Sequence, residues 1–107
     1  MIYDKLGERE KAVIELKKAI KFSPSLSKAH MDLGIVYAKI GKFDMAFEQF
    51  SRALEINPKI ADIHYNLGTL YELLNQTDKA KKEFDIACKL EPDSGLFKGK
   101  LLESRAD

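Results

Sequence analysis

The sequence predicts an all-α fold, an array of antiparallel helical hairpins, from three observations. The three prolines, Pro24, Pro58 and Pro92, are spaced 34 residues apart. Positions that differ by 34 carry similar residues, and a fixed period of this length is the signature of a repeat architecture. Apolar residues within each repeat recur at the three- and four-residue spacing of a helix. The 107 residues therefore form a single array with two complete repeats and a partial repeat at each end.

Each complete repeat is predicted to contain two helices joined by a short turn. Residues 27–40 and 43–56 make the first pair, and residues 61–74 and 77–90 make the second. Each proline follows a second helix, which it cannot continue. Small and large residues alternate along the second helices, as interdigitating helices require. These rows are Ala12, Ala46 and Ala80; Leu16, Phe50 and Phe84; and Ala19, Ala53 and Ala87.

The turn inside each hairpin is predicted from one residue suited to the left-handed backbone conformation. Gly41 separates the two helices of the first complete repeat, and Asn75 takes the equivalent position in the second. Gly7 occupies the same position in the N-terminal repeat. We therefore expect residues 9–22 to be a second helix whose own first helix survives only as residues 2–6.

The period and the repeated residues resemble the tetratricopeptide repeat (TPR), a 34-residue hairpin with the pattern Trp-x-x-Leu-Gly-x-x-Tyr, then Ala, Phe, Ala and Pro. The stretches HMDLGIVY (30–37) and HYNLGTLY (64–71) match it, with His30 and His64 in the place of Trp. The resemblance implies a right-handed superhelical solenoid. Its parts are a partial repeat (2–24), full repeats (27–60 and 61–94) and a terminal capping helix (95–107), where Leu102 stands in the place of Gly34 and Gly68.

Composition excludes several classes of function. Lys and Arg total 18 against 17 Asp and Glu, so the net charge of +1 argues against a nucleic-acid partner. No apolar run approaches the ~20 residues that span a bilayer, and the N-terminus lacks the apolar core of a signal peptide. The single cysteine, Cys88, has no partner for an internal disulfide and is expected to be a buried, inert thiol. A cytoplasmic protein without membrane insertion is the expectation.

Catalysis and metal binding are not expected. His30 and His64 lie on different first helices, and Gly34 and Gly68 stand where a second metal ligand at i+4 would be needed. The sequence contains no GxSxG, P-loop or GxGxxG motif. We therefore assign the histidines to packing and expect no enzyme activity, no cofactor and no metal.

A peptide-binding groove is the leading functional hypothesis. In the TPR family, first helices line the concave groove that commonly holds a partner peptide. Apolar side chains on such a face are unfavourable unless a partner covers them, and Asn66 is expected to fix the ligand backbone by hydrogen bonds. The predicted groove residues are Lys28, Met31, Asp32, Ile35, Lys39, Asp62, Tyr65, Asn66, Thr69, Glu72 and Lys100.

A subgroup of the family binds the C-terminal carboxylate of chaperones through a set of Lys, Asn and basic residues. In this sequence Met31 and Ile35 replace the first Lys–Asn pair, whereas Asn66 matches. Leu96 replaces one basic residue, and Lys100 alone can supply the other. The incomplete set argues against a chaperone-tail ligand.

The N-terminal repeat suggests an alternative function. Ala12, Leu16 and Ala19 are expected to pack on a first helix that the chain mostly lacks, so their face is apolar and open. Either the chain is a fragment of a longer array, which we favour, or another subunit covers this face. The alternatives to peptide binding are a self-assembling scaffold through these residues and the repeat arm of a larger enzyme.

Overall fold

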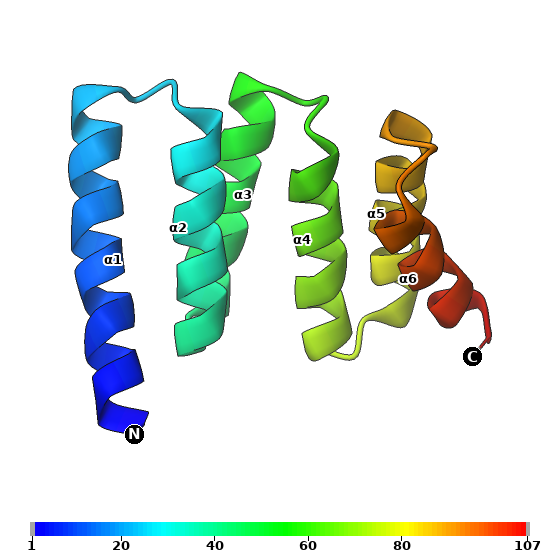
Figure 1. The fold of residues 1–107 in the computed structure, drawn as a ribbon, viewed down its shortest axis with the longest axis horizontal. Coiled ribbons are helices and arrows are strands. Elements are labelled where there is room, and N and C mark those ends of the chain that lie inside the picture. The colour runs from blue at the N-terminus through cyan, green and yellow to red at the C-terminus, as the bar shows by residue number, and fades with distance from the viewer. Residues whose placement is uncertain (1, 107) are drawn as a thin grey trace. The chain divides into compact units, whose positions relative to one another are not determined.

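The structure is a computed structural model that describes the backbone of residues 2–106 and the side chains of residues 7–100. Every regular element in that part of the chain is an α-helix, six in all, which confirms the all-α prediction. The chain divides into two compact units, Met1–Pro58 and Lys59–Asp107. Each unit contains three helices (Figure 1).

The first unit contains α1 (Ile2–Phe22), α2 (Ser27–Ile40) and α3 (Phe43–Ile56). Helices α2 and α3 form an antiparallel hairpin with both helices at their predicted bounds (Figure 1). Helix α1 packs against α2. The hydroxyl of Ser27 donates a hydrogen bond of 2.9 Å to the carbonyl of Ala53, which joins the start of α2 to the end of α3.

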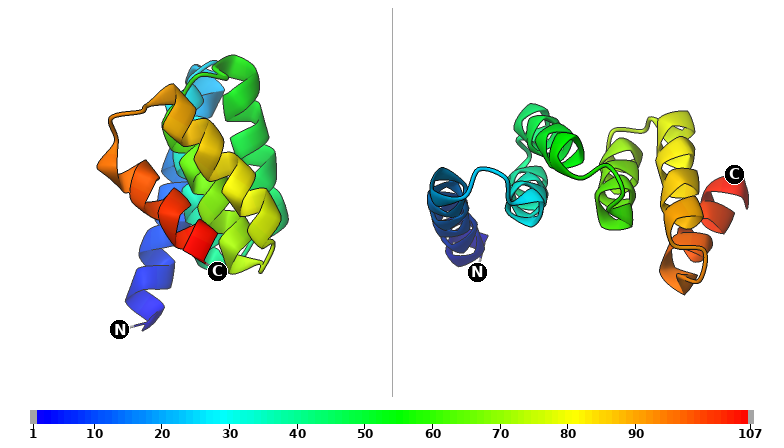
Figure 2. Two further views of the ribbon diagram at one scale, coloured as in Figure 1. Left: turned by 90° about the vertical axis from the view of Figure 1, so that its right-hand side faces the viewer. Right: turned by 90° about the horizontal axis from the view of Figure 1, so that it is seen from above.

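The second unit contains α4 (Ala61–Leu73), α5 (Thr77–Leu90) and α6 (Gly95–Ala106). Helices α4 and α5 form the second predicted hairpin, and α6 lies against α5 (Figure 2). Phe97, only 2% exposed, anchors α6 in a cluster with Ala61 and Ala87. The expectation for the side chain of Leu102 lies outside the described residues.

The turns of both hairpins have the predicted backbone geometry. Gly41 has φ +92° and Asn75 has φ +59°, and these are the positive-φ residues of the described backbone. The residue after each turn donates its N–H back into the first helix, Lys42 to the Tyr37 carbonyl and Gln76 to the Tyr71 carbonyl, both at 2.9 Å. This bond across a left-handed residue is a common way to end a helix.

The predicted break at Gly7 is wrong. Helix α1 runs without interruption from Ile2 to Phe22, so residues 2–6 continue the same helix and do not form a separate one. A helix of five residues is too short to be stable without extensive packing. Continuing α1 keeps the backbone hydrogen bonds that a turn at Gly7 would break, at the modest cost of one glycine in a helix.

Changing Gly7 to Ala is therefore expected to raise the free energy of unfolding by about 0.5–1 kcal/mol, the helix-propensity difference between the two residues. A Cβ at this position would meet no atom within 4 Å. Urea denaturation provides the measurement. Gly41→Ala is the matched control, because its left-handed backbone predicts a loss of about 1–2 kcal/mol. A comparable loss for Gly7→Ala would contradict the continuous helix.

The core of each hairpin depends on an aromatic ring that packs directly on a glycine. A Cβ built on Gly34 would lie 2.7 Å from Cε1 of Phe50, and one on Gly68 would lie 2.5 Å from Cε1 of Phe84. Both rings are buried, at 1% and 0% exposure. Gly34 and Gly68 therefore permit close helix packing, and the structure identifies the rings that need the space.

Candidate functional site

The predicted groove residues of the first unit all lie on α2. Lys28 and Lys39 are exposed, whereas Met31, Asp32 and Ile35 are partly buried. Met31 and Ile35 are four residues apart, so their side chains are neighbours on one face of the helix. This face combines a small apolar centre with a positive charge toward each end.

Tyr65, predicted to be an exposed groove residue, is instead partly buried between helices. Its ring centroid lies 5.9 Å from that of Phe84 in α5 and 5.3 Å from that of Phe97 in α6. Tilted aromatic pairs at these distances are stabilising. Tyr65 therefore holds α4, α5 and α6 together. Like Met31 and Ile35, it was expected to be exposed, and all three are partly buried.

Two further predicted groove residues of α4 already have partners within the second unit. The Thr69 hydroxyl donates a 3.1 Å hydrogen bond to the carbonyl of Tyr65 in its own helix. Glu72 forms a 3.0 Å ion pair with Lys100 of α6, whose amine also lies 5.6 Å from the centroid of the Phe84 ring. These partners reduce the capacity of the three groups to bind a ligand.

Asp62 and Asn66 are the polar groups of α4 that stay available. Asp62 is exposed in the first turn of the helix. Asn66 is partly buried, and its amide makes no hydrogen bond to any other described residue. A side-chain amide offers both donors and an acceptor, which suits it to an extended peptide backbone.

Both histidines link the two helices of their own hairpin. Nδ1 of His30 lies 2.8 Å from the side-chain amide of Gln49, and its Nε2 donates to the carbonyl of Pro24 at 3.0 Å. Nδ1 of His64 donates to the carboxylate of Glu83 at 2.9 Å. Their bonds therefore support the packing role assigned from the sequence. Among the described residues no three potential ligands gather as a metal site.

Cys88 is partly buried beside the cluster that anchors α6, where it packs with Ala87 and Phe97. The sequence predicted a buried thiol, whereas the structure has Cys88 only partly buried. No described helix combines the length and apolarity needed to cross a bilayer.

The N-terminal face is more exposed than its equivalents elsewhere in the chain. Ala12, Leu16 and Ala19 of α1 are only partly buried. The six residues at equivalent positions of α3 and α5 are 0–1% exposed, because a first helix covers them. Ala12, Leu16 and Ala19 are thus less buried than their equivalents, and the assembly role of this face stays a prediction. The covered residues are Ala46, Phe50, Ala53, Ala80, Phe84 and Ala87.

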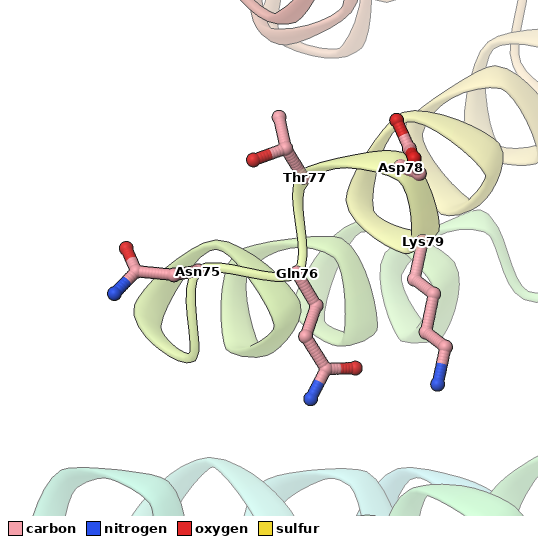
Figure 3. A pocket seen from close by; sticks show the side chains of 5 residues that line it. All are labelled: Asn75, Gln76, Thr77, Asp78 and Lys79. Carbon is pink, nitrogen blue, oxygen red and sulfur yellow. The ribbon is translucent and has the colours of Figure 1, made fainter.

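A hollow at the turn between α4 and α5 was not predicted from the sequence. Residues 75–79 line it, and Figure 3 shows that their side chains point in different directions. No group of polar atoms converges on one point there. The hollow therefore has the form of an open turn and not that of a ligand site.

The sequence reasoning also missed Phe97, although the period contained the signal. Phe97 stands 34 residues after Ile63 and 68 after Ala29, and all three are buried. Extending the repeat register to residue 97 identifies it as a packing residue. Its position explains why α6 covers the ring of Tyr65.

Three family models match the chain. One, described as TPR repeat, matches residues 36–75, and two, described as tetratricopeptide repeat, match residues 1–26 and 61–94. The matches agree with the 34-residue period, the hairpins and the packed glycines. The chain belongs to the tetratricopeptide repeat family. No curated protein matches the sequence.

Two solved structures show the same fold. The first TPR of Spaghetti (RPAP3), bound to the HSP90 peptide SRMEEVD, is 20% identical with a TM-score of 0.84, over 97% of this chain and 82% of that chain. TTC0263, a thermophilic TPR protein of Thermus thermophilus, is 25% identical with a TM-score of 0.89, over 94% of this chain. This chain spans 52% of the length of TTC0263.

Proposed function

We propose that this protein is a non-catalytic interaction module that binds a segment of a partner protein on the free face of α2, and that the free face of α4 is a second candidate surface in its own unit. Met31 and Ile35 are the observation that supports the proposal most. They form an apolar pair on α2 and stay partly exposed, with Lys28 and Lys39 beside them. Burying such a pair against a ligand is favourable, and the flanking lysines suit a partner segment with acidic residues.

Asn66 and Asp62 are the polar groups of the second candidate surface, on α4. The Asn66 amide has no hydrogen bond to another described residue and can bond a ligand backbone. Tyr65, Thr69, Glu72 and Lys100 contribute chiefly to packing in this proposal. A location in the cytoplasm belongs to the same proposal and is supported by the single cysteine, which cannot form an internal disulfide.

Peptides that are selected from a random library for binding to the unmodified protein serve as probes of this surface. We expect the double change Met31→Ala and Ile35→Ala to weaken binding of a selected peptide at least about tenfold, because it removes the apolar contact. For a selected peptide that binds the α4 surface, Asn66→Ala is expected to weaken binding about fivefold by removing hydrogen bonds. Titration calorimetry measures the dissociation constants.

The control changes lie on α3, where Glu48 and Arg52 form a surface ion pair of 3.4 Å. Glu48→Ala with Arg52→Ala is expected to leave peptide affinity unchanged, and circular dichroism checks that every variant stays helical. Tyr65→Ala is unsuitable as a binding test because its ring packs between α5 and α6. Peptides that bind the α2 double variant and the unmodified protein equally well would exclude this surface.

Self-assembly is the second candidate function, and the partly exposed Ala12, Leu16 and Ala19 specifically favour it. Ile14 and Phe22 of the same helix are 54% and 86% exposed, so α1 carries further apolar surface. Apolar surface of this kind is typical of a site that another helix covers.

A further inference from the structure

The two complete hairpins pair their helices through the same register positions. A glycine of the first helix packs against the phenylalanine sixteen positions later in the second helix. The pairs are Gly34 with Phe50 and Gly68 with Phe84. A histidine meets a residue nineteen positions later, His30 with Gln49 and His64 with Glu83. These two pairings define which positions of the first helix contact which positions of the second helix in a hairpin of this chain.

Among the described residues, α1 and α6 have no hairpin partner of the kind that α2–α3 and α4–α5 provide. Helix α1 is equivalent to the second helices α3 and α5, and α6 is equivalent to the first helices α2 and α4. In the same register, Glu15 of α1 occupies the position of Gln49 and Glu83. Lys98 of α6 occupies the position of His30 and His64.

The charges at these positions are complementary. Lys98 is exposed, and its amine makes no hydrogen bond or ion pair with another described residue. The side chain of Glu15 is 74% exposed, and its one described partner is Lys18, at 3.7 Å within α1. An α6 helix paired with an α1 helix in the hairpin register would place a lysine opposite a glutamate, where the complete hairpins have His–Gln and His–Glu.

The residues at the second pairing differ from those of the complete hairpins. Leu102 stands at the position of Gly34 and Gly68 in the sequence, whereas Leu16 stands at the position of Phe50 and Phe84. A composite hairpin would therefore have a leucine–leucine contact where the complete hairpins have a ring packed on a glycine. The face that contains Leu16 is also the partly exposed face of α1.

We propose that α6 of one copy of this chain docks antiparallel on α1 of a second copy and completes a composite hairpin in the register of α2–α3 and α4–α5. Lys98 of one copy pairs with Glu15 of the next. Because the contact joins two different faces, a dimer leaves one face of each kind unpaired, and association continues beyond two copies unless a ring closes. This inference concerns a surface separate from the proposed peptide-binding faces.

Sedimentation velocity of the unmodified chain, from micromolar concentrations to about 1 mM, tests the proposal. The average mass is expected to rise with concentration past that of a dimer. Leu16→Glu places a charge on the apolar face and is expected to weaken association at least tenfold. Ile86→Glu, an exposed position of α5 at 37% exposure, is the control and is expected to leave association unchanged.

Charge reversal tests the register. Glu15→Lys and Lys98→Glu are each expected to weaken association about two- to fivefold, the range of an exposed ion pair. An equimolar mixture of the two single variants is expected to regain it, because Lys98 of the first variant meets Glu15 of the second and the reversed residues meet each other. The double variant is expected to associate as the unmodified chain does.

Three outcomes would overturn the proposal. The first is a monomer at every concentration. The second is a mass that stops at a dimer and is insensitive to Lys98→Glu, which would indicate an α1–α1 contact. The third is a mixture of the single variants that associates no better than either variant alone.

Discussion

Changing Phe84 to Ala is expected to lower the free energy of unfolding by about 3–5 kcal/mol, the usual cost of removing a fully buried phenylalanine. Its ring is 0% exposed, lies against Gly68 and is 5.9 Å from the ring of Tyr65. Neighbours held in helices cannot close the space left by the ring. Urea denaturation monitored by circular dichroism measures the change.

The matched control for this change is Ile86→Ala, two residues away in the same helix. Ile86 is 37% exposed, so its truncation is expected to cost less than about 1 kcal/mol. Phe84→Leu is a milder variant that stays folded if Phe84→Ala does not, with an expected loss of about 1–1.5 kcal/mol. A loss below about 1 kcal/mol for Phe84→Ala would show that the ring does not organise the second unit.

Changing Gly68 to Ala is the second large effect, with an expected loss of about 1–2 kcal/mol. Helix propensity alone favours Ala by about 1 kcal/mol. The new Cβ, however, would lie 2.5 Å from Cε1 and 2.7 Å from Cδ1 of Phe84. The ring cannot move away, because it is fully buried, and overpacking of this kind costs more than the propensity gains.

Two further variants distinguish this clash from a general effect of the mutation. Gly99→Ala places a Cβ in open space on α6 and is expected to be neutral or stabilising by up to about 1 kcal/mol. Gly68→Ala combined with Phe84→Leu is expected to lose less stability than the sum of the single changes. Strictly additive losses would contradict the assignment of the clash to the Phe84 ring.

The sequence was sufficient to predict the hairpins because a fixed period constrains many positions together. Pro58, Gly41 and Asn75 delimit the helices, and the structure places the helix ends within one residue of the predictions for both complete repeats. The packing residues were likewise predictable, since Phe50 and Phe84 recur at the same position and are both buried.

Gly7 could not be assigned correctly by the same reasoning. Glycine is compatible with both a left-handed turn and a helix, and the packing of the flanking segments decides between them. Around Gly41 two long helices cover each other. At Gly7 the backbone stays helical, and α1 runs from Ile2 to Phe22.

The groove residues remain a prediction, because their exposure cannot be read from the repeat pattern alone. Periodicity separates repeating positions from variable ones but does not show whether a neighbouring element covers a variable position. Tyr65 and Met31 occupy equivalent positions of the two repeats and are different residues. Tyr65 is nevertheless a packing residue, because the ring of Phe97 in α6 lies against it. Glu72 and Lys100 also occupy variable positions of the repeat, and they form an ion pair with each other. Met31, Ile35 and Asn66 are thus the predicted residues that best retain a capacity to bind a partner.

The central claim is that repeating residues build the fold, whereas variable residues on the first helix of a hairpin bind a partner. Amide chemical-shift mapping of ¹⁵N-labelled protein with a library-selected peptide tests it most directly. The account predicts that the largest shifts lie around Met31 and Ile35 of α2 or, for a peptide selected on the second surface, around Asn66 of α4. Largest shifts on α3 around Glu48 and Arg52, with α2 and α4 unaffected, would contradict it.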